Sequence, residues 1–220
     1  MKKVFIMNGS PRENWNTAKM CKSFSDGLQT KGIETEIVNL YDIDFKGCRS
    51  CFACKLNGGK NFSRCAYPDE LTSVLDKISH ADGLVVASPI YFGDVTGVVR
   101  CFTERLMFPF FQYDGKFSST APKKLETALI YTMNVNEDAC NQMYTDFMKR
   151  IDWFYEKVFG TTPVRIFAFD TYQFSDYSKY ASECFDPVHK KKQLEEQLPK
   201  DLNTAFNEGV KMAERINNGN

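Results

Sequence analysis

Four cysteines lie close together in one short stretch of the 220-residue chain. In GCRSCFACKLNGGKNFSRC, residues 47–65, three recur every third residue and the fourth follows after ten more: Cys48, Cys51, Cys54 and Cys65. Thiolates at this spacing can hold three corners of a cuboidal iron–sulfur cluster, which a fourth thiolate closes. Zinc fits less well, because structural zinc favours two separated pairs of cysteines or mixtures with histidine. Thiols that only pack or form subunit contacts are the third interpretation, and these residues alone leave the choice open.

A second candidate site follows the first apolar run of the chain. The segment NGSPRENWNT, residues 8–17, ends where a helix is predicted to begin, and the free N–H groups of a helix start can bind an anion. Several side chains here can donate to phosphate oxygens: Ser10, Arg12, Asn16 and Thr17. The segment is neither a Walker loop nor a GxGxxG dinucleotide fingerprint. A phosphate site is therefore one interpretation, and a helix cap, which favours the same residue types, is the other.

A third candidate site follows the apolar run DGLVVAS, in which a buried strand is predicted to end at Ser88. The chain then turns through Pro89, Ile90, Tyr91, Phe92 and Gly93. Two aromatic rings beside a glycine offer a flat apolar surface with backbone N–H groups nearby, which suits a planar heterocycle. The alternative is a loop whose aromatic rings only cover the core.

The elements that must position these sites alternate between strand and helix. Apolar and alternating runs predict five strands, at 2–10, 33–40, 82–88, 124–134 and 164–170. Helical spacing of apolar residues predicts helices at 16–31, 69–81, 95–108, 137–159 and 193–216. This alternation predicts a parallel sheet with helices on both faces, a three-layer α/β sandwich. Five strands fit the flavodoxin-like order 2-1-3-4-5, in which ligands bind at the carboxyl ends of the strands.

Composition narrows the range of functions. The chain has 28 basic and 28 acidic residues, a balance that argues against nucleic acid or a membrane surface as partner. It has no run of about 18 apolar residues, and its first residues resemble a strand rather than a signal peptide. We therefore expect a cytoplasmic protein with reduced thiols, in which a cysteine cluster more often indicates metal or catalysis than disulfides. The scattered cysteines are expected to be buried small hydrophobes: Cys21, Cys101, Cys140 and Cys184.

Taken together, GSPRENWNT and the later SPIYFGDVTGVVRCFTERL resemble the NAD(P)H-dependent FMN reductase family of flavodoxin-like proteins. The resemblance covers residues 2–106, with weaker agreement as far as Asn134. It implies that the first loop holds the FMN phosphate and that the second contacts the flavin ring. It also implies that YTMN, with Thr132 and Asn134, approaches the ring from the fourth strand, although this chain lacks the glycines usual there.

The resemblance implies an enzyme in which FMN takes a hydride from NADH or NADPH. Electrons would then pass to a quinone, a flavin or a similar small acceptor. No side chain is needed as acid or base, so we expect no catalytic residue apart from the groups that hold FMN. The family also implies a homodimer or a homotetramer. A flavodoxin-type electron carrier fits less well, because flavodoxins are strongly acidic and this chain is not.

The cysteine-rich stretch resembles a branch of the same superfamily, the iron–sulfur flavoproteins. In that branch a compact cysteine motif holds a [4Fe–4S] cluster near FMN, and GCRSCFAC matches its first three ligands. The ten-residue gap before Cys65 departs from the compact motif. The alternative function is therefore electron transfer through FMN and a cluster.

We predict a single domain over residues 1–220, because no repeat or linker divides the chain. Two segments exceed the minimal fold: a cysteine-rich insertion at 46–68 and a polar, aromatic-rich extension at 170–192. In a homo-oligomer the extension could cover the flavin of the partner subunit or form the substrate pocket, and a surface loop is the alternative. The charge run HKKKQLEEQ, residues 189–197, predicts a solvated helix start, with binding of the NADPH phosphate as the alternative.

Overall fold

Five parallel strands form the central sheet of the computed structural model, which describes residues 1–219. They are β1 (Lys3–Asn8), β2 (Glu34–Asn39), β3 (Gly83–Tyr91), β5 (Glu126–Thr132) and β6 (Val164–Ala168). Across the sheet their order is β2-β1-β3-β5-β6, which confirms the flavodoxin-like order 2-1-3-4-5. An additional short strand, β4 (Asp94–Val95), pairs antiparallel with the end of β3.

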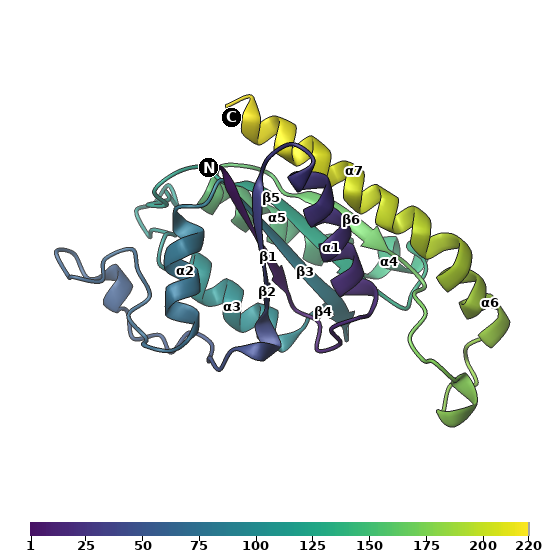
Figure 1. Cartoon of the computed structure of the whole chain (residues 1–220). Coiled ribbons are helices and arrows are strands. Elements are labelled where there is room, and N and C mark those ends of the chain that lie inside the picture. Colours follow the sequence, from purple (N-terminus) through teal and green to yellow (C-terminus); the bar gives the residue numbers. More distant parts are fainter. Residues whose placement is uncertain (220) are drawn as a thin grey trace.

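Helices cover both faces of the sheet (Figure 1). One face packs against α1 (Asn16–Gln29) and α7 (Leu198–Asn217). The other packs against α2 (Leu71–Ser79), α3 (Gly97–Met107) and α5 (Thr145–Phe159). The predicted three-layer sandwich is thereby confirmed, and all parallel strands end at the same edge of the sheet.

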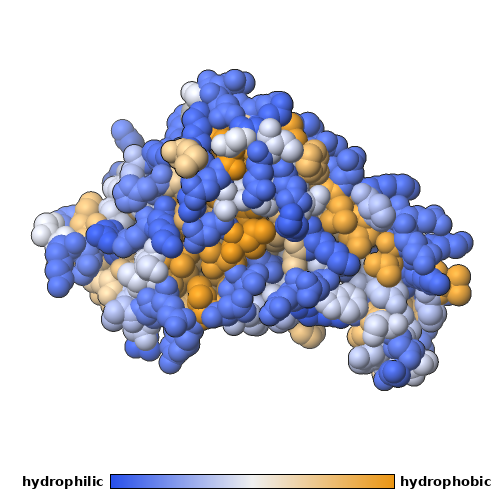
Figure 2. Space-filling view, in the orientation of Figure 1, coloured by the Kyte–Doolittle hydropathy of each residue, from blue (hydrophilic) through white to orange (hydrophobic). Residues whose placement is uncertain are grey.

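The outer surface is mostly hydrophilic in the view of Figure 2, with an apolar area near its centre. The edge strand β2 contributes to the exposed apolar surface, since Ile37 is 39% exposed. Across residues 1–219, none of the helices combines the length and the apolar character needed to span a membrane.

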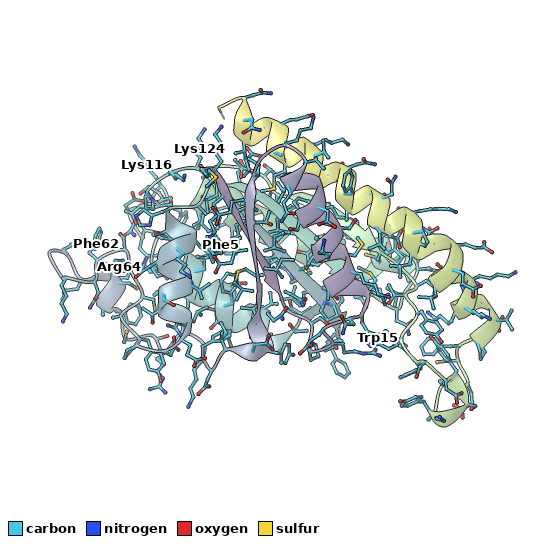
Figure 3. The ribbon with its side chains drawn as sticks, viewed as in Figure 1. Phe5, Trp15, Phe62, Arg64, Lys116 and Lys124 are labelled. Atoms are coloured by element: carbon cyan, nitrogen blue, oxygen red, sulfur yellow. The ribbon has the colours of Figure 1, made fainter. Side chains whose placement is uncertain are left out.

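The two segments that exceed the minimal fold lie toward opposite ends of the view. The cysteine-rich insertion is irregular except for a 3-10 turn at Ala53–Lys55, and Figure 3 shows its residues Phe62 and Arg64 at one end of the molecule. Trp15, which precedes α1, lies toward the other end (Figure 3). The extension passes near Trp15, because that ring stacks on Tyr172 with 6.2 Å between ring centroids.

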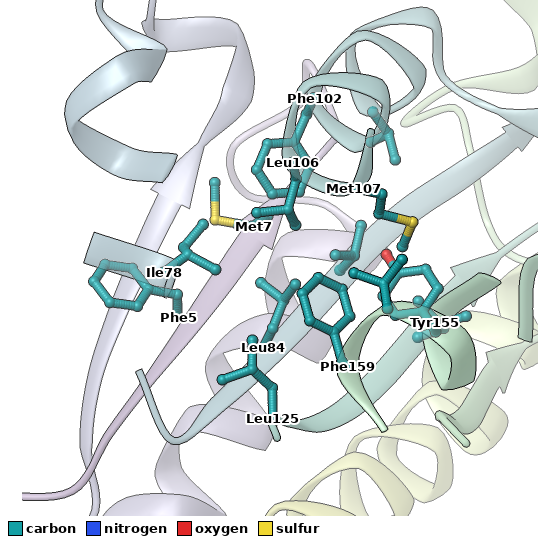
Figure 4. Packing of buried hydrophobic residues seen from close by; sticks show 14 of the residues in the cluster. Phe5, Met7, Ile78, Leu84, Phe102, Leu106, Met107, Leu125, Tyr155 and Phe159 are labelled. Atoms are coloured by element: carbon teal, nitrogen blue, oxygen red, sulfur yellow. The ribbon is translucent and has the colours of Figure 1, made fainter. Parts of the chain in front are cut away.

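Two hydrophobic clusters follow from the alternation of side chains along the strands. In β1, Val4 and Ile6 belong to the cluster under α1 and α7, whereas Phe5 and Met7 belong to the cluster under α2, α3 and α5. Successive side chains of a strand point to opposite faces, so a continuous apolar run fills both cores. Figure 4 shows the second cluster, which includes Phe5, Met7, Leu84, Phe102, Leu106 and Phe159.

Three predicted boundaries were wrong. The helix expected at 137–159 is two helices, α4 (Glu137–Met143) and α5, separated at Tyr144. The last helical segment begins with α6 (Pro187–Lys192) and continues through a π-helical turn at Gln193–Gln197 into α7, so it starts before residue 193. Asp186 accepts a hydrogen bond from the N–H of Val188 and caps this earlier start. Strand β3 continues past Ser88 to Tyr91, because β4 pairs with its end.

Candidate functional site

A pocket of about 170 Å³ lies at the carboxyl edge of the sheet, between the loops that follow β1 and β5 and the last residues of β3. Nine of the eleven residues predicted to contact FMN line it: Ser10, Arg12, Asn16, Thr17, Pro89, Ile90, Tyr91, Thr132 and Asn134. The fold therefore brings together three loops that are far apart in the sequence. Phe92 and Gly93 are not among the residues that line the pocket.

The loop after β1 is held against β3 and α3 by a glycine. The N–H of Gly9 donates to the carbonyl of Ala87 at 2.8 Å, and the Thr96 hydroxyl donates to the carbonyl of Gly9 at 2.9 Å. A Cβ atom at residue 9 would lie 2.0 Å from Val99 Cγ2. Only glycine allows this close approach, so it fixes where the loop turns toward the pocket.

The N-terminus of α1 opens at this loop without a side-chain cap. Trp15 occupies the cap position in extended conformation and makes no capping hydrogen bond. The helix-cap interpretation of the loop was therefore wrong. Because the first N–H groups of a helix have no acceptor within the helix, they remain available to an anion. Ser10 instead shapes the loop, since its hydroxyl accepts from the N–H of Arg12 at 3.1 Å.

Arg12 and Asn16 connect this loop to the extension. Arg12 Nη1 donates to the carbonyl of Gln173 at 2.7 Å, and Asn16 Nδ2 donates to the carbonyl of Tyr172 at 2.8 Å. The guanidinium carbon of Arg12 lies 3.3 Å from the centroid of the Trp15 ring. Burial lowers the pKa of Arg12 from its ordinary value, but an arginine side chain stays charged at any physiological pH. The pocket thus contains a permanent positive charge.

Two buried hydroxyl groups meet at the floor of the pocket. Thr17, on the first turn of α1, and Thr132, at the end of β5, are 3% and 4% exposed, and their hydroxyl oxygens lie 2.8 Å apart. One hydroxyl donates to the other, so one proton remains available to another acceptor. This contact ties the start of α1 to the end of β5.

The loop after β3 becomes a tight hairpin. Tyr91 pairs with Asp94, and the two residues between them, Phe92 and Gly93, have φ of 52° and 83°. Positive φ at both central residues is the pattern of a type I′ turn, which glycine favours at its second position. Phe92 projects fully into solvent, whereas Tyr91 lines the pocket. Burial raises the pKa of the Tyr91 phenol, which is therefore protonated at neutral pH.

Four further residues line the pocket that were not individually predicted to contact FMN: Trp15, Met133, Thr171 and Gln173. Trp15 and Met133 lie within the quoted motifs, so their position could have suggested them. Thr171 and Gln173 belong to the extension, whose contact with the pocket depends on hydrogen bonds to residues more than 150 positions away. The extension is thus a wall of the pocket.

The residues of the pocket fit FMN. An uncapped helix start, a guanidinium and hydroxyl groups form a donor set for a phosphate. Beside them, Pro89, Ile90 and Tyr91 provide an apolar wall, and Asn134 provides polar groups that can contact a heterocycle.

The four clustered cysteines border a separate small cavity of about 20 Å³. Cys48 and Cys51 are exposed, Cys65 is partly buried and Cys54 is buried. Burial raises the pKa of Cys54 above its ordinary value. Ser50 and Phe52, between these cysteines, have positive φ, so the backbone turns tightly here. This cavity shares no lining residue with the pocket at the sheet edge.

Arg105 of α3 holds both ends of the insertion. Its side chain is fully buried and pairs with Asp69, and its Nε donates to Cys65 Sγ at 3.3 Å. Two further bonds reach the carbonyls of Lys46 and Tyr67, at 3.2 and 3.0 Å. One guanidinium therefore fixes the insertion where it leaves and rejoins the fold.

The cysteine cavity has the right thiol ligands for a cluster, but these side chains are not spaced as the ligands of a metal ion would be. Four thiols on one cavity match the ligands of a [4Fe–4S] cluster. Within residues 1–219, however, no three His, Cys, Asp or Glu side chains are arranged to hold a metal ion.

The prediction for the scattered cysteines was correct for two of them. Cys21 and Cys140 are buried, whereas Cys101 is partly buried and Cys184 is exposed. Burial raises the pKa of Cys21 to about 12, so this thiol stays protonated. Cys184 lies on an exposed part of the extension.

Comparison with known proteins places these features in a family. The sequence model of NADPH-dependent FMN reductases matches residues 2–130. An iron–sulfur flavoprotein of Archaeoglobus fulgidus is 36% identical over 103 residues, which are 47% of this chain and 48% of the relative. Another, from Methanocaldococcus jannaschii, is 33% identical over 103 residues, covering 47% and 51% of the two chains. The match thus spans about half the length of these curated relatives.

Solved structures share the fold over nearly the whole chain. An NAD(P)H:quinone oxidoreductase from Methanothermobacter marburgensis aligns with a TM-score of 0.69 at 13% identity, covering 95% of this chain and 98% of that one. An FMN-dependent NADH-azoreductase from Bacillus anthracis, solved with FMN, aligns with a TM-score of 0.64 at 15% identity, covering 98% and 99%. At such identities the likeness concerns the fold alone.

Proposed function

The chain belongs to the NADPH-dependent FMN reductase family, and we propose that it is an FMN-dependent oxidoreductase that carries electrons from NADH or NADPH to a small acceptor. The observation that carries this proposal is the pocket at the sheet edge, where an uncapped helix start, Arg12 and two hydroxyl groups meet beside an apolar wall. FMN, when bound, supplies the hydride chemistry. The protein supplies binding, orientation and electrostatics.

The loop after β1 would hold the phosphate. Arg12 offers a planar, permanently charged fork, and Ser10 and Thr17 offer hydroxyl groups. Asn16 and the first N–H groups of α1 add neutral donors at the positive end of the helix dipole. All of these groups lie on one short loop and one helix turn, so the site is largely formed before a ligand binds.

The end of β3 and the loop after β5 would hold the ring. Pro89, Ile90 and Tyr91 form the apolar side, and Thr132 and Asn134 form the polar side. Backbone N–H groups in such loops can stabilise negative charge that develops on a reduced ring. Contact of the ring with Phe92 and Gly93 stays a prediction, because the hairpin turn lies beside the pocket lining.

A quinone, a flavin or a similar small molecule is the proposed acceptor. Two structural neighbours carry the names quinone oxidoreductase and azoreductase, which supports small oxidants of this kind. Equal numbers of acidic and basic residues disfavour a flavodoxin-type carrier. We further propose a cytoplasmic homodimer or homotetramer, which analytical ultracentrifugation of the purified protein would test.

Fluorescence titration of FMN tests the pocket. The double variant Arg12→Ala/Thr17→Ala should weaken FMN binding by about 2–4 kcal/mol, because each charge-assisted or hydroxyl contact is worth about 1–2. This corresponds to an increase in Kd between about 30-fold and about 1000-fold. The matched control is Arg64→Ala/Thr204→Ala, which makes the same changes at exposed sites on the insertion and on α7. Equal affinity in the two double variants would refute the assignment.

A second candidate function is electron transfer through FMN and a [4Fe–4S] cluster. One observation favours it: Cys48, Cys51, Cys54 and Cys65 border the same cavity, with Arg105 beside Cys65. Curated relatives named iron–sulfur flavoproteins support the same idea. The thiolates would bind the cluster, and the guanidinium would donate a hydrogen bond to one sulfur, which tunes a cluster's potential.

Iron analysis of protein purified without oxygen separates the two functions. A cluster protein should contain about four iron atoms per chain, and Cys54→Ala should lose them while still binding FMN. A protein that binds FMN but contains no iron after anaerobic purification and reconstitution with iron and sulfide would exclude the second function.

A further inference from the structure

Lys190 is a buried charge within a run that the sequence predicts to be solvated. It is 2% exposed, whereas Lys191 and Lys192, which follow it on α6, are exposed. Burying an ammonium group is costly unless acceptors surround it. The position of Lys190 therefore requires partners, and these come from two other segments of the chain.

Three acceptors surround the Lys190 ammonium. Its Nζ donates to Asn134 Oδ1 and to Asp170 Oδ1, and the carbonyl of Thr171 lies 3.4 Å away. Asp170 is also held by His189, whose Nε2 lies 2.5 Å from the second carboxylate oxygen. An ammonium has three protons and no acceptor, so this environment satisfies it completely. Lys190 thus joins α6 to the loop after β5 and to the start of the extension.

The bond to Asn134 fixes the orientation of its carboxamide. Lysine can only donate, so the carboxamide must turn its oxygen toward Nζ. Its NH₂ group is then directed away from Lys190, and Asn134 lines the pocket. Lys190 therefore selects one of the two orientations of the Asn134 carboxamide, the one in which the NH₂ group is free to donate.

We propose that Lys190 is a positioning residue of this pocket: it holds the Asn134 carboxamide so that the NH₂ group donates to an acceptor atom on the edge of the bound flavin ring. The inference rests on the proposed FMN site and deepens it. It also assigns the extension to the site, because Lys190 fixes the point where the extension begins.

The backbone of the extension supports this role. Three consecutive carbonyl groups, of Thr171, Tyr172 and Gln173, accept hydrogen bonds from Lys190, Asn16 and Arg12. The N–H groups of Asp170 and Thr171 donate to the carbonyls of Val135 and Met133 at 2.9 and 3.0 Å. Lys190 links α6 to the first of these carbonyl groups, next to the contact of His189 with Asp170, and so clamps the wall at one end.

A double-mutant cycle on FMN affinity tests the proposal. Lys190→Met and Asn134→Ala should each raise the Kd for FMN about tenfold, the usual cost of one hydrogen bond to a well-placed donor. The Kd of the double variant should also be only about tenfold higher than that of the wild type, because both changes remove the same interaction. A product of the single effects, about a hundredfold, would show that Lys190 does not act through Asn134 and would overturn the proposal.

Asn134→Asp provides a second test that does not remove the lysine. Aspartate keeps an acceptor for Lys190 but replaces the NH₂ donor with an oxygen, so the chain should fold and bind FMN about tenfold more weakly. The matched control Lys192→Met makes the same change as Lys190→Met at an exposed site of α6 and should leave the Kd unchanged. Wild-type affinity in Asn134→Asp would also overturn the proposal.

Hydrogen exchange without FMN separates this inference from the proposed function. In the protein without ligand, the N–H groups of Asp170 and Thr171 should exchange faster in Lys190→Met than in Lys192→Met. If wild-type protein binds no FMN, the proposed function fails whatever the exchange rates are. If FMN binds and these rates are equal in both variants, Lys190 does not hold the wall and the inference fails alone.

Discussion

Arg12 carries five N–H donors on one planar group, and the structure uses only part of them within the chain. Nη1 donates to the carbonyl of Gln173, and the face of the guanidinium lies on the ring of Trp15. The stacking fixes the plane of the guanidinium, which keeps the remaining donors in the pocket. One residue thus connects the loop after β1 with the extension.

Asp170 makes the stability of this region depend on pH. Burial by itself would raise the pKa of its carboxyl, but hydrogen bonds from Lys190 and His189 outweigh burial and lower it. A lowered pKa in the folded state stabilises the fold above the ordinary aspartate pKa of about 4, and this contribution is lost as the pH falls through the lowered value. Acid should therefore weaken the attachment of the extension.

Thermal unfolding of Asp170→Asn tests this linkage. At neutral pH the free energy of unfolding of the variant should be about 2 kcal/mol lower than that of the wild type, because hydrogen bonds to a charged group are weakened. Asparagine tolerates the positive φ of 49° at this position, so backbone strain should not contribute. The difference in Tm from wild type should shrink as the pH is lowered below about 4. A Tm difference between variant and wild type that stays constant as the pH is lowered below about 4 would refute the linkage.

The helices α1 and α7 pack backbone to backbone through two glycines. A Cβ atom at Gly27 would lie 2.1 Å from the carbonyl oxygen of Phe206, and one at Gly209 would lie 2.3 Å from that of Phe24. Neither carbonyl can move without shifting its helix. Since α1 also presents its N-terminus to the pocket, this crossing sets the position of that helix start.

Gly209→Ala should therefore destabilise the fold by about 2–3 kcal/mol, since overpacking against backbone cannot be relieved by a rotamer change. Gly97→Ala is the matched control, because no atom lies within 4 Å of the added methyl group. Urea unfolding of both variants measures the difference. If Gly209→Ala is as stable as Gly97→Ala, the helices can separate and the crossing does not fix α1.

The order of the strands was predictable, but some helix boundaries were not. Continuous apolar runs such as Val4 to Met7 fill both cores, and this pattern is visible in the sequence. The break at Tyr144 has no glycine or proline to indicate it. The early start of the last helical segment did have a signal, because Asp186 followed by Pro187 is a typical cap and first helical residue.

The whole molecule gathers residues from distant segments at one edge of the sheet. The loops at 10–17, 89–91 and 132–134 could be predicted to meet, because parallel strands end at the same edge. The burial of Lys190 could not be predicted from the sequence, because its acceptors lie 19 to 56 positions away along the chain. The contact of Gln173 with Arg12 depends in the same way on the path of the extension.

In the proposed reaction, FMN bound in the pocket at the sheet edge accepts a hydride from NADH or NADPH. The most direct test is to add FMN to the purified protein, remove oxygen, and add one equivalent of NADH or NADPH while the visible spectrum is recorded. We predict that the long-wavelength flavin absorption bleaches and that a quinone added afterwards restores it. A flavin spectrum that persists with both nucleotides would show that the bound FMN accepts no hydride from them.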